Sequence, residues 1–322
     1  MNALEKITEK VLLNKEITKA EAMELINEDL NQLTTAANQI REHFCGNGFD
    51  ICTIINAKSG KCSENCKYCA QSASYETKVE QYPLLTKEEI TEQAKYNDER
   101  GVLRFSLVTS GKRLSDEEIM KACEAIRKLK QETEIAVCVS MGLLEEKQFR
   151  LLKEAGATRV HNNLEASESY FANVCTTHTF ADKVEAIKAA KRAGLSVCSG
   201  GIMGLGETME DRIDLAFSLK KLDICSVPVN MLNPIKGTPY EENPILTNEE
   251  MCRIIAIFRF ILPKASIRLA GGRGLLADKG RSCFLSGANA AISGDMLTTS
   301  GISIEPDKKM LKELGYEIRL WK

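Results

Sequence analysis

Short apolar runs that alternate with longer amphipathic segments constrain the fold of this chain more than any other feature. The predicted strands, rich in branched apolar residues, span 51–56, 103–109, 135–140, 158–164, 195–200, 224–231, 266–269 and 290–292. The predicted helices between them span 87–100, 116–131, 145–155, 183–193, 210–222 and 248–262. Such an alternation favours a parallel barrel with helices outside, because the right-handed crossover rule leaves few other closures. The sequence therefore predicts an α/β fold, a (β/α)8 TIM-type barrel, with a doubly wound open sheet as the alternative.

The first 48 residues follow a different pattern. Apolar residues at helical spacing and a capping box at Thr18 and Glu21 predict helices and no strand in this part of the chain. A last helix is predicted over 306–314. Two units are therefore expected: an N-terminal helical extension, 1–48, and a barrel with its C-terminal helix, 49–322.

Charge and cysteine usage exclude several classes of function. Forty-three basic and 45 acidic residues give a net charge of -2, so no strong field attracts nucleic acid or an anionic membrane. No apolar run reaches the length of about 18 residues that a membrane span needs, and the first residues do not form a signal sequence, so a cytoplasmic protein is expected. Twelve cysteines in such a chain indicate metal or cluster ligation rather than disulfides.

Three cysteines, Cys62, Cys66 and Cys69, lie four and three residues apart directly after the first predicted strand. Zinc sites usually combine a C-x2-C pair with a distant second pair, and a [4Fe-4S] cluster prefers four cysteines. A compact set of three therefore indicates a [4Fe-4S] cluster with one iron open to a small ligand. This C-x3-C-x-aromatic-C loop resembles that of the radical S-adenosylmethionine superfamily; the alternatives are a zinc loop or a turn without a metal.

Two further cysteines lie on predicted strands. Cys138 alternates with valines on the third strand, and Cys198 lies at the corresponding place on the fifth, so both side chains are expected to point into the barrel. They could ligate a second cluster deep in the barrel, whereas each taken singly is also typical of an ordinary buried cysteine.

Several motifs in order resemble the biotin synthase family from about residue 40 to residue 300. They are Cys66-Lys-Tyr-Cys69-Ala-Gln-Ser, Cys198-Ser-Gly-Gly-Ile-Met-Gly-Leu-Gly-Glu207, Ser226-Val-Pro-Val-Asn230, Gly237-Thr-Pro, Ile267-Arg268-Leu and Cys283-Phe-Leu-Ser-Gly-Ala-Asn289. The resemblance implies a sulfurtransferase that uses a radical, made from S-adenosylmethionine at the [4Fe-4S] cluster, to insert sulfur into dethiobiotin. A radical suits this reaction because unactivated C–H bonds resist acid-base chemistry. The resemblance also implies an auxiliary iron-sulfur cluster as the sulfur source.

The same resemblance assigns roles to single residues. Those implied to contact S-adenosylmethionine are Tyr68, Asn163, Glu165, Lys183, Gly204 and Glu207. Asn163 and Asn230 match substrate-binding positions, and Cys198 with Arg268 matches the sulfur-donating centre. Lys183 stands where the family has an arginine. Lysine keeps the positive charge but lacks the planar guanidinium group that binds a carboxylate through two hydrogen bonds.

The auxiliary site departs from the family pattern. Ser106 stands where the family has a cysteine, and serine is a harder, less acidic ligand for iron. Cys52 on the neighbouring first strand could replace the missing thiolate. The hypothesis is an altered auxiliary site in which Cys52, Cys138 and Cys198, with Arg268 nearby, hold the cluster. This cluster is either the [2Fe-2S] type that is usual in the family or a larger one. Cys175 is a second candidate for the missing ligand.

The resemblance also implies partners: dethiobiotin, an electron donor such as flavodoxin or ferredoxin, and a second copy of the chain in a homodimer, with no nucleic acid and no membrane. Another radical enzyme of this barrel type, such as a hydrogenase maturase, is the alternative within the superfamily. A tRNA methylthiotransferase would need a basic RNA-binding domain, for which the sequence has no candidate. A cluster carrier or electron-transfer protein would not need a whole barrel.

Overall fold

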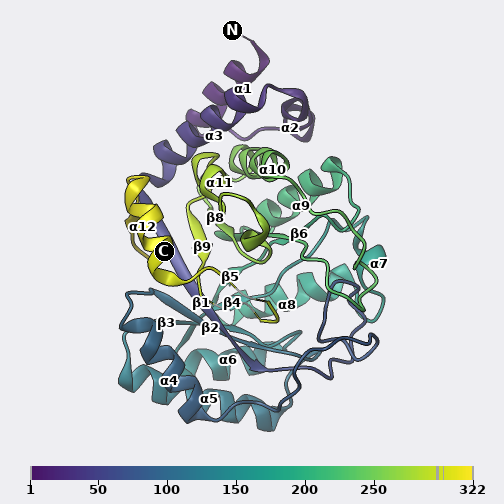
Figure 1. The fold of residues 1–322 in the computed structure, drawn as a ribbon, viewed down its shortest axis with the longest axis vertical. Coiled ribbons are helices and arrows are strands. Elements are labelled where there is room, and N and C mark those ends of the chain that lie inside the picture. The colour runs from purple at the N-terminus through teal and green to yellow at the C-terminus, as the bar shows by residue number, and fades with distance from the viewer. Residues whose placement is uncertain (1, 295–296, 300, 321–322) are drawn as a thin grey trace.

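A closed barrel of eight parallel strands forms the centre of the computed structural model, which describes residues 2–294, 297–299 and 301–320 (Figure 1). Its strands, in their order around the barrel, are β1 (Gly48–Lys58), β2 (Arg104–Thr109), β3 (Ala136–Ser140), β4 (Ala157–His161), β5 (Ser196–Cys198), β7 (Ser226–Met231), β8 (Ser266–Leu269) and β9 (Ala290–Ile292). Strand β9 pairs with β1 and closes the ring. The predicted barrel is therefore confirmed, and the open-sheet alternative is wrong.

Helices cover the outside of the barrel, as the strand-helix alternation predicts. They are α4 (Lys87–Asp98), α5 (Asp116–Glu132), α6 (Glu146–Ala155), α7 (Phe171–Val174), α8 (Phe180–Arg192), α9 (Met209–Lys221) and α10 (Asn248–Ile261). Most begin at a capping box, for example at Thr86 and Ser115, where the cap side chain accepts a hydrogen bond from the third helical amide. Helix α8 begins three residues earlier than predicted, because Thr179 and Asp182 form another such box.

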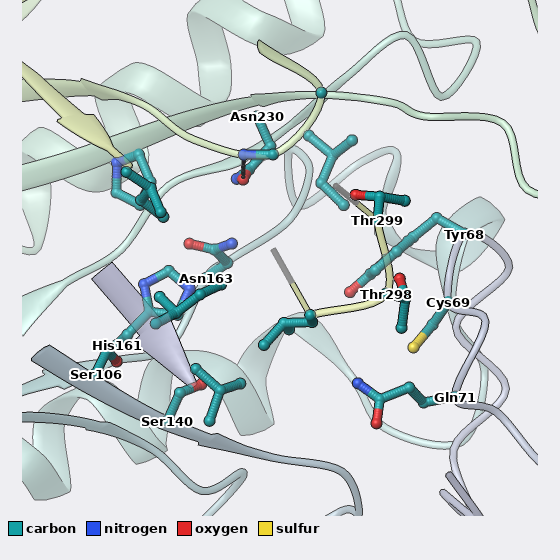
Figure 2. Close-up of a pocket in the computed structure, with 18 of the residues that line it drawn as sticks. Tyr68, Cys69, Gln71, Ser106, Ser140, His161, Asn163, Asn230, Thr298 and Thr299 are labelled. Carbon is teal, nitrogen blue, oxygen red and sulfur yellow. Dashed lines mark hydrogen bonds between the residues drawn. The ribbon is translucent and has the colours of Figure 1, made fainter. Parts of the chain in front are cut away.

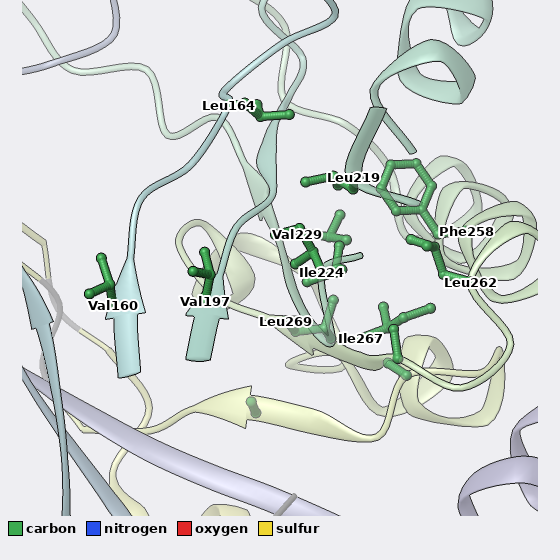
Figure 3. Close-up of a cluster of buried hydrophobic side chains, with 14 of the residues drawn as sticks. Val160, Leu164, Val197, Leu219, Ile224, Val229, Phe258, Leu262, Ile267 and Leu269 are labelled. Atoms are coloured by element: carbon green, nitrogen blue, oxygen red, sulfur yellow. The ribbon is translucent and has the colours of Figure 1, made fainter. Parts of the chain in front are cut away.

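Apolar side chains pack between the strands and this helical layer (Figure 3). Val160, Val197, Val229 and Ile267 point outward from four strands and are buried against helices such as α9 and α10. Since alternate residues of a strand face opposite sides, the residues directly before and after each of these four side chains point into the barrel. The outer face supplies the hydrophobic core, and the inner face is left for polar side chains and thiols.

The fifth strand is shorter than its predicted span of 195–200. It ends at Cys198, and the chain resumes as β6 (Gly201–Met203), which also pairs with β7. A Cβ atom at Gly200 would lie 1.8 Å from the carbonyl oxygen of Pro228, so only glycine lets the two backbones approach this closely. The break brings the segment after Cys198 across the carboxyl end of the barrel.

The N-terminal residues form helices, as predicted, at one end of the molecule (Figure 1). They are α1 (Ala3–Leu12), α2 (Lys19–Glu24), the 3-10 helix η1 (Leu25–Asn27) and α3 (Leu30–Cys45). Arg253 of α10 donates hydrogen bonds to the carbonyl oxygens of Ile26 and Glu28, at 3.0 and 2.8 Å, and so fixes this unit to the barrel. No helix in the described ranges is long and apolar enough to cross a membrane.

The C-terminal segment packs across the barrel near β1. Its elements are η2 (Arg273–Leu275), α11 (Arg281–Leu285), α12 (Ile304–Glu313) and the short strand β10 (Glu317–Ile318), which extends the sheet beside the start of β1. The predicted terminal helix over 306–314 is confirmed and begins two residues earlier. Asp307 of α12 forms a buried ion pair with Arg273 and accepts a hydrogen bond from Ser293.

Replacing Asp307 with alanine should destabilise the fold. The side chains of Arg273 and Asp307 are 1% and 3% exposed, so the substitution leaves a guanidinium buried without its carboxylate. Breaking such a pair costs about 3–5 kcal/mol, to be measured by urea denaturation. Glu305→Ala on the same helix removes only an exposed pair with Lys308 and is the control. Equal stabilities of the two variants would contradict the role given to the buried pair.

Candidate active site

A cavity of about 380 Å³ opens at the carboxyl ends of the barrel strands, and the residues that line it come from almost every strand (Figure 2). In a parallel barrel this end collects the loops that bind ligands. Thiols, amides and one carboxylate line the cavity, together with Thr298 and Thr299 from the segment after β9. The cavity therefore contains most of the residues that the sequence singled out.

The three-cysteine loop follows β1 and is closed on itself by backbone hydrogen bonds. The amide of Cys62 donates to the carbonyl oxygen of Gln71 at 3.0 Å, and the amide of Cys69 donates to that of Cys66 at 3.0 Å. Cys62 and Cys69 line the mouth of the cavity. The loop thus brings two of its three thiols to the cavity.

Cys66 has different surroundings from the other two cysteines. Its thiol lies beside Cys175 and His178, which follow α7, and the ligand atoms of these three residues are all within 4.8 Å of one another. A hydrogen bond between the two thiols raises the pKa of Cys66 and lowers that of Cys175. Cys175 therefore lies next to Cys66 of the three-cysteine loop. It does not lie at the auxiliary site, for which the sequence made it a second candidate ligand.

The loop fits a cluster with one open metal position. It supplies three partly exposed thiols, and no fourth cysteine lies in the loop itself. Two of the three thiols face the cavity, so a ligand in the cavity could reach a metal held by the loop. This donor set suits a [4Fe-4S] cluster better than a structural zinc ion, which would take four protein ligands.

Polar groups beside the loop fit a ligand that donates hydrogen bonds. Glu165 lines the cavity with a φ of 70°, a left-handed conformation that is rare outside glycine and is typical of functional sites. Its Oε2 atom is buried and has no hydrogen-bond partner among the described residues. Burial and the nearby Glu165 carboxylate raise the pKa of Tyr68 well above its ordinary value. Tyr68 and Glu165 thus present a phenol and an unsatisfied carboxylate to the same side of the cavity.

Two asparagines, Asn163 and Asn230, line the cavity and form hydrogen bonds to the backbone at the β5–β6 break (Figure 2). The Oδ1 atom of Asn163 accepts a hydrogen bond from the Gly200 amide at 3.0 Å. Asn230 donates to the carbonyl oxygen of Gly201 at 3.0 Å and accepts from the Gly271 amide at 2.9 Å. Because backbone groups hold both amides, their orientation is fixed before any ligand binds.

Three of the six residues implied to contact S-adenosylmethionine do not line the cavity. Glu207 accepts hydrogen bonds from the Gly204 amide at 2.9 Å and from Arg212 at 2.6 Å, and so holds the turn after β6. Gly204 has a φ of +99°, which this turn requires. Lys183 donates to Asn162 at 3.4 Å. These three residues lie outside the cavity lining, and their contacts with a cofactor stay a prediction.

Three further thiols lie inside the barrel. Cys52, Cys138 and Cys198 come from β1, β3 and β5, and all three are buried and line the cavity. Ser106 is the register partner of Cys138 on the adjacent strand β2. Arg268 donates a hydrogen bond to Cys52 at 3.2 Å and forms an ion pair with Asp50 at 3.3 Å. The four predicted auxiliary-site residues therefore line one cavity.

Positive charge surrounds these thiols. Burial raises the pKa of Cys52 to about 12, although the charge of Arg268 opposes this effect. At Cys198 burial acts in the same direction, but a hydrogen bond from His161 and the charges of Arg268 and Arg159 outweigh it and lower the pKa to about 6. An anionic cluster bound by the thiolates would fit these surroundings, because arginines would compensate its charge.

Family models match almost all of the barrel. The radical SAM superfamily model matches residues 57–219, and the model of the biotin and thiamin synthesis associated domain matches residues 228–317. A biotin synthase of Brachyspira hyodysenteriae is 60% identical over 318 residues, which are 99% of this chain and 96% of that relative. The chain belongs to the biotin synthase family. The biotin synthases of Akkermansia muciniphila and of Clostridium botulinum (strain Loch Maree) are 55% and 54% identical, and each match covers 99% of this chain and 100% of the relative.

Solved structures show that the fold extends beyond the biotin synthase family. Methylornithine synthase superposes with a TM-score of 0.84 over 98% of this chain and 97% of that protein, at 22% identity. A maturase of the [FeFe]-hydrogenase superposes with a TM-score of 0.84 over 99% of this chain and 76% of that protein, at 20% identity. At this level of identity the likeness concerns the fold alone, so the maturase alternative is not favoured.

Several charged residues around the thiols in this biotin synthase family member were not predicted. Asp50, Arg104 and Arg159 each lie two positions before an inward-facing residue of β1, β2 or β4. The alternation of the strands was therefore sufficient to find them. The Nε atom of Arg104 is buried and has no hydrogen-bond partner among the described residues, and Arg159 lies 4.0 Å from the Asp50 carboxylate.

Proposed function

We propose that this biotin synthase family member inserts sulfur into dethiobiotin to form biotin. The observation that carries the proposal is the arrangement of thiols in one cavity. Two cysteines of the C-x3-C-x2-C loop lie at its mouth, and Cys52, Cys138 and Cys198 lie inside the barrel. A substrate between these two groups would have a radical source on one side and a sulfur source on the other.

The loop cysteines Cys62, Cys66 and Cys69 hold the [4Fe-4S] cluster in this proposal. When bound, that cluster supplies the electron that cleaves S-adenosylmethionine into methionine and a 5'-deoxyadenosyl radical. Glu165 accepts hydrogen bonds from the ribose, which would satisfy its buried Oε2 atom, and Tyr68 packs against the adenine. The barrel wall excludes water and competing hydrogen donors from the radical.

The two fixed asparagines bind the substrate. Asn163 and Asn230 present amide groups to the cavity, and an amide matches both the donors and the acceptor of a cyclic urea. Because backbone hydrogen bonds hold these side chains in place, the substrate carbons are oriented without a further entropic cost. Such positioning matters for a radical that reacts with whichever C–H bond is closest.

Cys52, Cys138 and Cys198 would hold an altered auxiliary cluster, and Arg268 lies close enough to compensate its negative charge. When bound, this cluster, of the family's [2Fe-2S] type or larger, would supply the sulfur. Reducing equivalents come from a flavodoxin or ferredoxin, and the protein works as a homodimer with the N-terminal helices, 1–48, as a separate unit beside the barrel.

Replacing Glu165 with glutamine is expected to weaken S-adenosylmethionine binding about tenfold to a hundredfold, because a charge-assisted hydrogen bond is worth about 1.5–3 kcal/mol. Equilibrium dialysis of the cluster-loaded protein measures this affinity. Glu168→Gln, three residues away and exposed, is the control. If both variants bind as tightly as the unaltered protein, Glu165 does not contact the cofactor.

The proposed activity is tested with protein reconstituted anaerobically with iron and sulfide. S-adenosylmethionine, a reductant and dethiobiotin are added, and 5'-deoxyadenosine and biotin are detected by mass spectrometry. Both products are expected. If deoxyadenosine forms without biotin, the radical chemistry stands and the proposed substrate or sulfur source is wrong; if neither forms in cluster-loaded protein, the proposal fails as a whole.

A further inference from the structure

Cys66, Cys175 and His178 form a compact cluster, and none of the three lines the cavity. We propose that these three residues bind one zinc(II) ion when the iron-sulfur cluster is absent, and that zinc and the cluster exclude each other because both need Cys66. This site is separate from the sulfur-insertion reaction. It concerns the form of the protein that has not yet received its cluster.

The separations of the donor atoms are close to those of a zinc site. Tetrahedral zinc with ordinary bond lengths places two sulfurs about 3.8 Å apart and a sulfur and a nitrogen about 3.6 Å apart. Here Nδ1 of His178 is 3.3 Å from Sγ of Cys175, and the ligand atoms of all three residues lie within 4.8 Å of one another. The donors therefore need to move by only about 1 Å to close around a metal.

A carboxylate lies beside the same ring nitrogen. Oε2 of Glu64 lies 2.6 Å from Nδ1 of His178, and both residues are buried. A metal bound by Nδ1 would replace the proton shared between these two atoms, and the carboxylate oxygen of Glu64 would then be free to serve as a further ligand.

The two chain segments that carry the ligands are already docked on each other. Asn65, next to Cys66, accepts hydrogen bonds from the amides of Thr176 and Thr177 at 2.9 and 3.2 Å. The amide of Lys67 donates to the carbonyl oxygen of Val174 at 3.0 Å. Cys66 and Cys175 are thus held together by contacts that do not involve their sulfurs, so little ordering entropy is lost when a metal binds.

Two thiolates and an imidazole are the ligands that zinc(II) prefers, whereas magnesium and calcium prefer oxygen. Binding forms two Zn–S bonds and one Zn–N bond and releases the thiol protons to solvent, without any change of oxidation state. Glu64 or water completes the coordination. Since Cys66 cannot serve two centres, zinc bound here blocks assembly of the radical cluster until it is displaced.

Cobalt(II) is the probe, because its thiolate complexes absorb visible light and zinc does not. The full-length, reduced, metal-free protein is titrated with cobalt(II) under anaerobic conditions and then with zinc(II). One cobalt per chain is expected, with the absorption of a tetrahedral thiolate site that zinc abolishes. Cys175→Ala and His178→Gln should each weaken binding more than the ten- to hundredfold typical of an outer partner, and Glu64→Gln by about tenfold.

Two controls separate this site from the cluster site. Cys62→Ala removes a cluster ligand but not a zinc ligand, so it should bind cobalt as the unaltered protein does. Protein already loaded with its cluster should bind no cobalt here. Zinc present during reconstitution should lower the cluster yield of the unaltered protein but not of Cys175→Ala, whose folding is checked by circular dichroism.

The proposal is overturned if folded Cys175→Ala and His178→Gln bind cobalt as tightly as the unaltered protein, or if Cys62→Ala abolishes binding. It is also overturned if cluster-loaded protein binds cobalt with undiminished affinity. These measurements need neither S-adenosylmethionine nor dethiobiotin, so their failure would leave the proposed activity untouched. Failure of the sulfur-insertion assay would likewise say nothing against a zinc site.

Discussion

Replacing Cys62 with alanine is expected to abolish the cleavage of S-adenosylmethionine, with a fall in 5'-deoxyadenosine formation of at least about a thousandfold. Cys62 is one of the two loop thiols that line the mouth of the cavity. Without it the loop keeps two thiolates, which is too few to hold a cluster that leaves one iron open. Iron and sulfide contents after anaerobic reconstitution, together with mass spectrometry of the nucleoside product, measure the effect.

The matched control for this prediction is Cys225→Ala. Cys225 is partly exposed, lies immediately before β7 and does not line the cavity, so its loss removes a thiol without touching either cluster site. This variant should keep both its cluster and its cleavage activity. If Cys62→Ala retains a redox-active cluster and forms deoxyadenosine at a normal rate, the assignment of the loop is wrong.

The second large effect is expected for Cys52→Ala. Biotin formation should fall by at least about a hundredfold, while deoxyadenosine is still formed, because Cys52 is not one of the loop cysteines assigned to the [4Fe-4S] cluster. The physical reason is the loss of one of the three thiols proposed to hold the auxiliary cluster, at the position where Arg268 donates its hydrogen bond. Iron content and visible absorption should decrease to the level of a single cluster per chain.

A paired substitution sharpens this test. Ser106 lies on β2, next to both β1 and β3, and is the register partner of Cys138. The double variant Cys52→Ser, Ser106→Cys moves the thiol to the position that the family pattern expects and keeps the number of thiols constant. Partial recovery of biotin formation relative to Cys52→Ala would support a thiolate requirement. Full activity of Cys52→Ala itself would show that Cys52 only packs.

The sequence predicted the barrel because its pattern is local and repeated. Apolar strands, amphipathic helices and capping boxes such as the one at Thr86 each depend on a few neighbouring residues, and the observed elements match them to within a few residues. The predicted strands 158–164 and 195–200 both run beyond the ends of β4 and β5, and the second of them runs to Gly200. That residue lies against the carbonyl oxygen of Pro228, a contact between segments 28 residues apart, so no local pattern could indicate the break.

The candidate site was only partly predictable from the sequence, because some of its contacts join residues that are far apart along the chain. The spacing of Cys62, Cys66 and Cys69 is a local motif, and strand alternation correctly indicated that Cys138 and Cys198 point inward. That Cys52 lines the same cavity, and that Asp50 forms an ion pair with Arg268, depends on the closure of the barrel, in which β9 pairs with β1.

The sequence by itself determined the fold class and the family, because both depend on short-range patterns or on motifs that occur in order along the chain. Only the tertiary structure decided which side chains share a space. It placed Cys175 and His178 against Cys66, more than 100 residues away along the chain, and surrounded the barrel thiols with arginines. Contacts of this kind arise when strands and loops close on one another, and the identity of a residue does not reveal its distant neighbours.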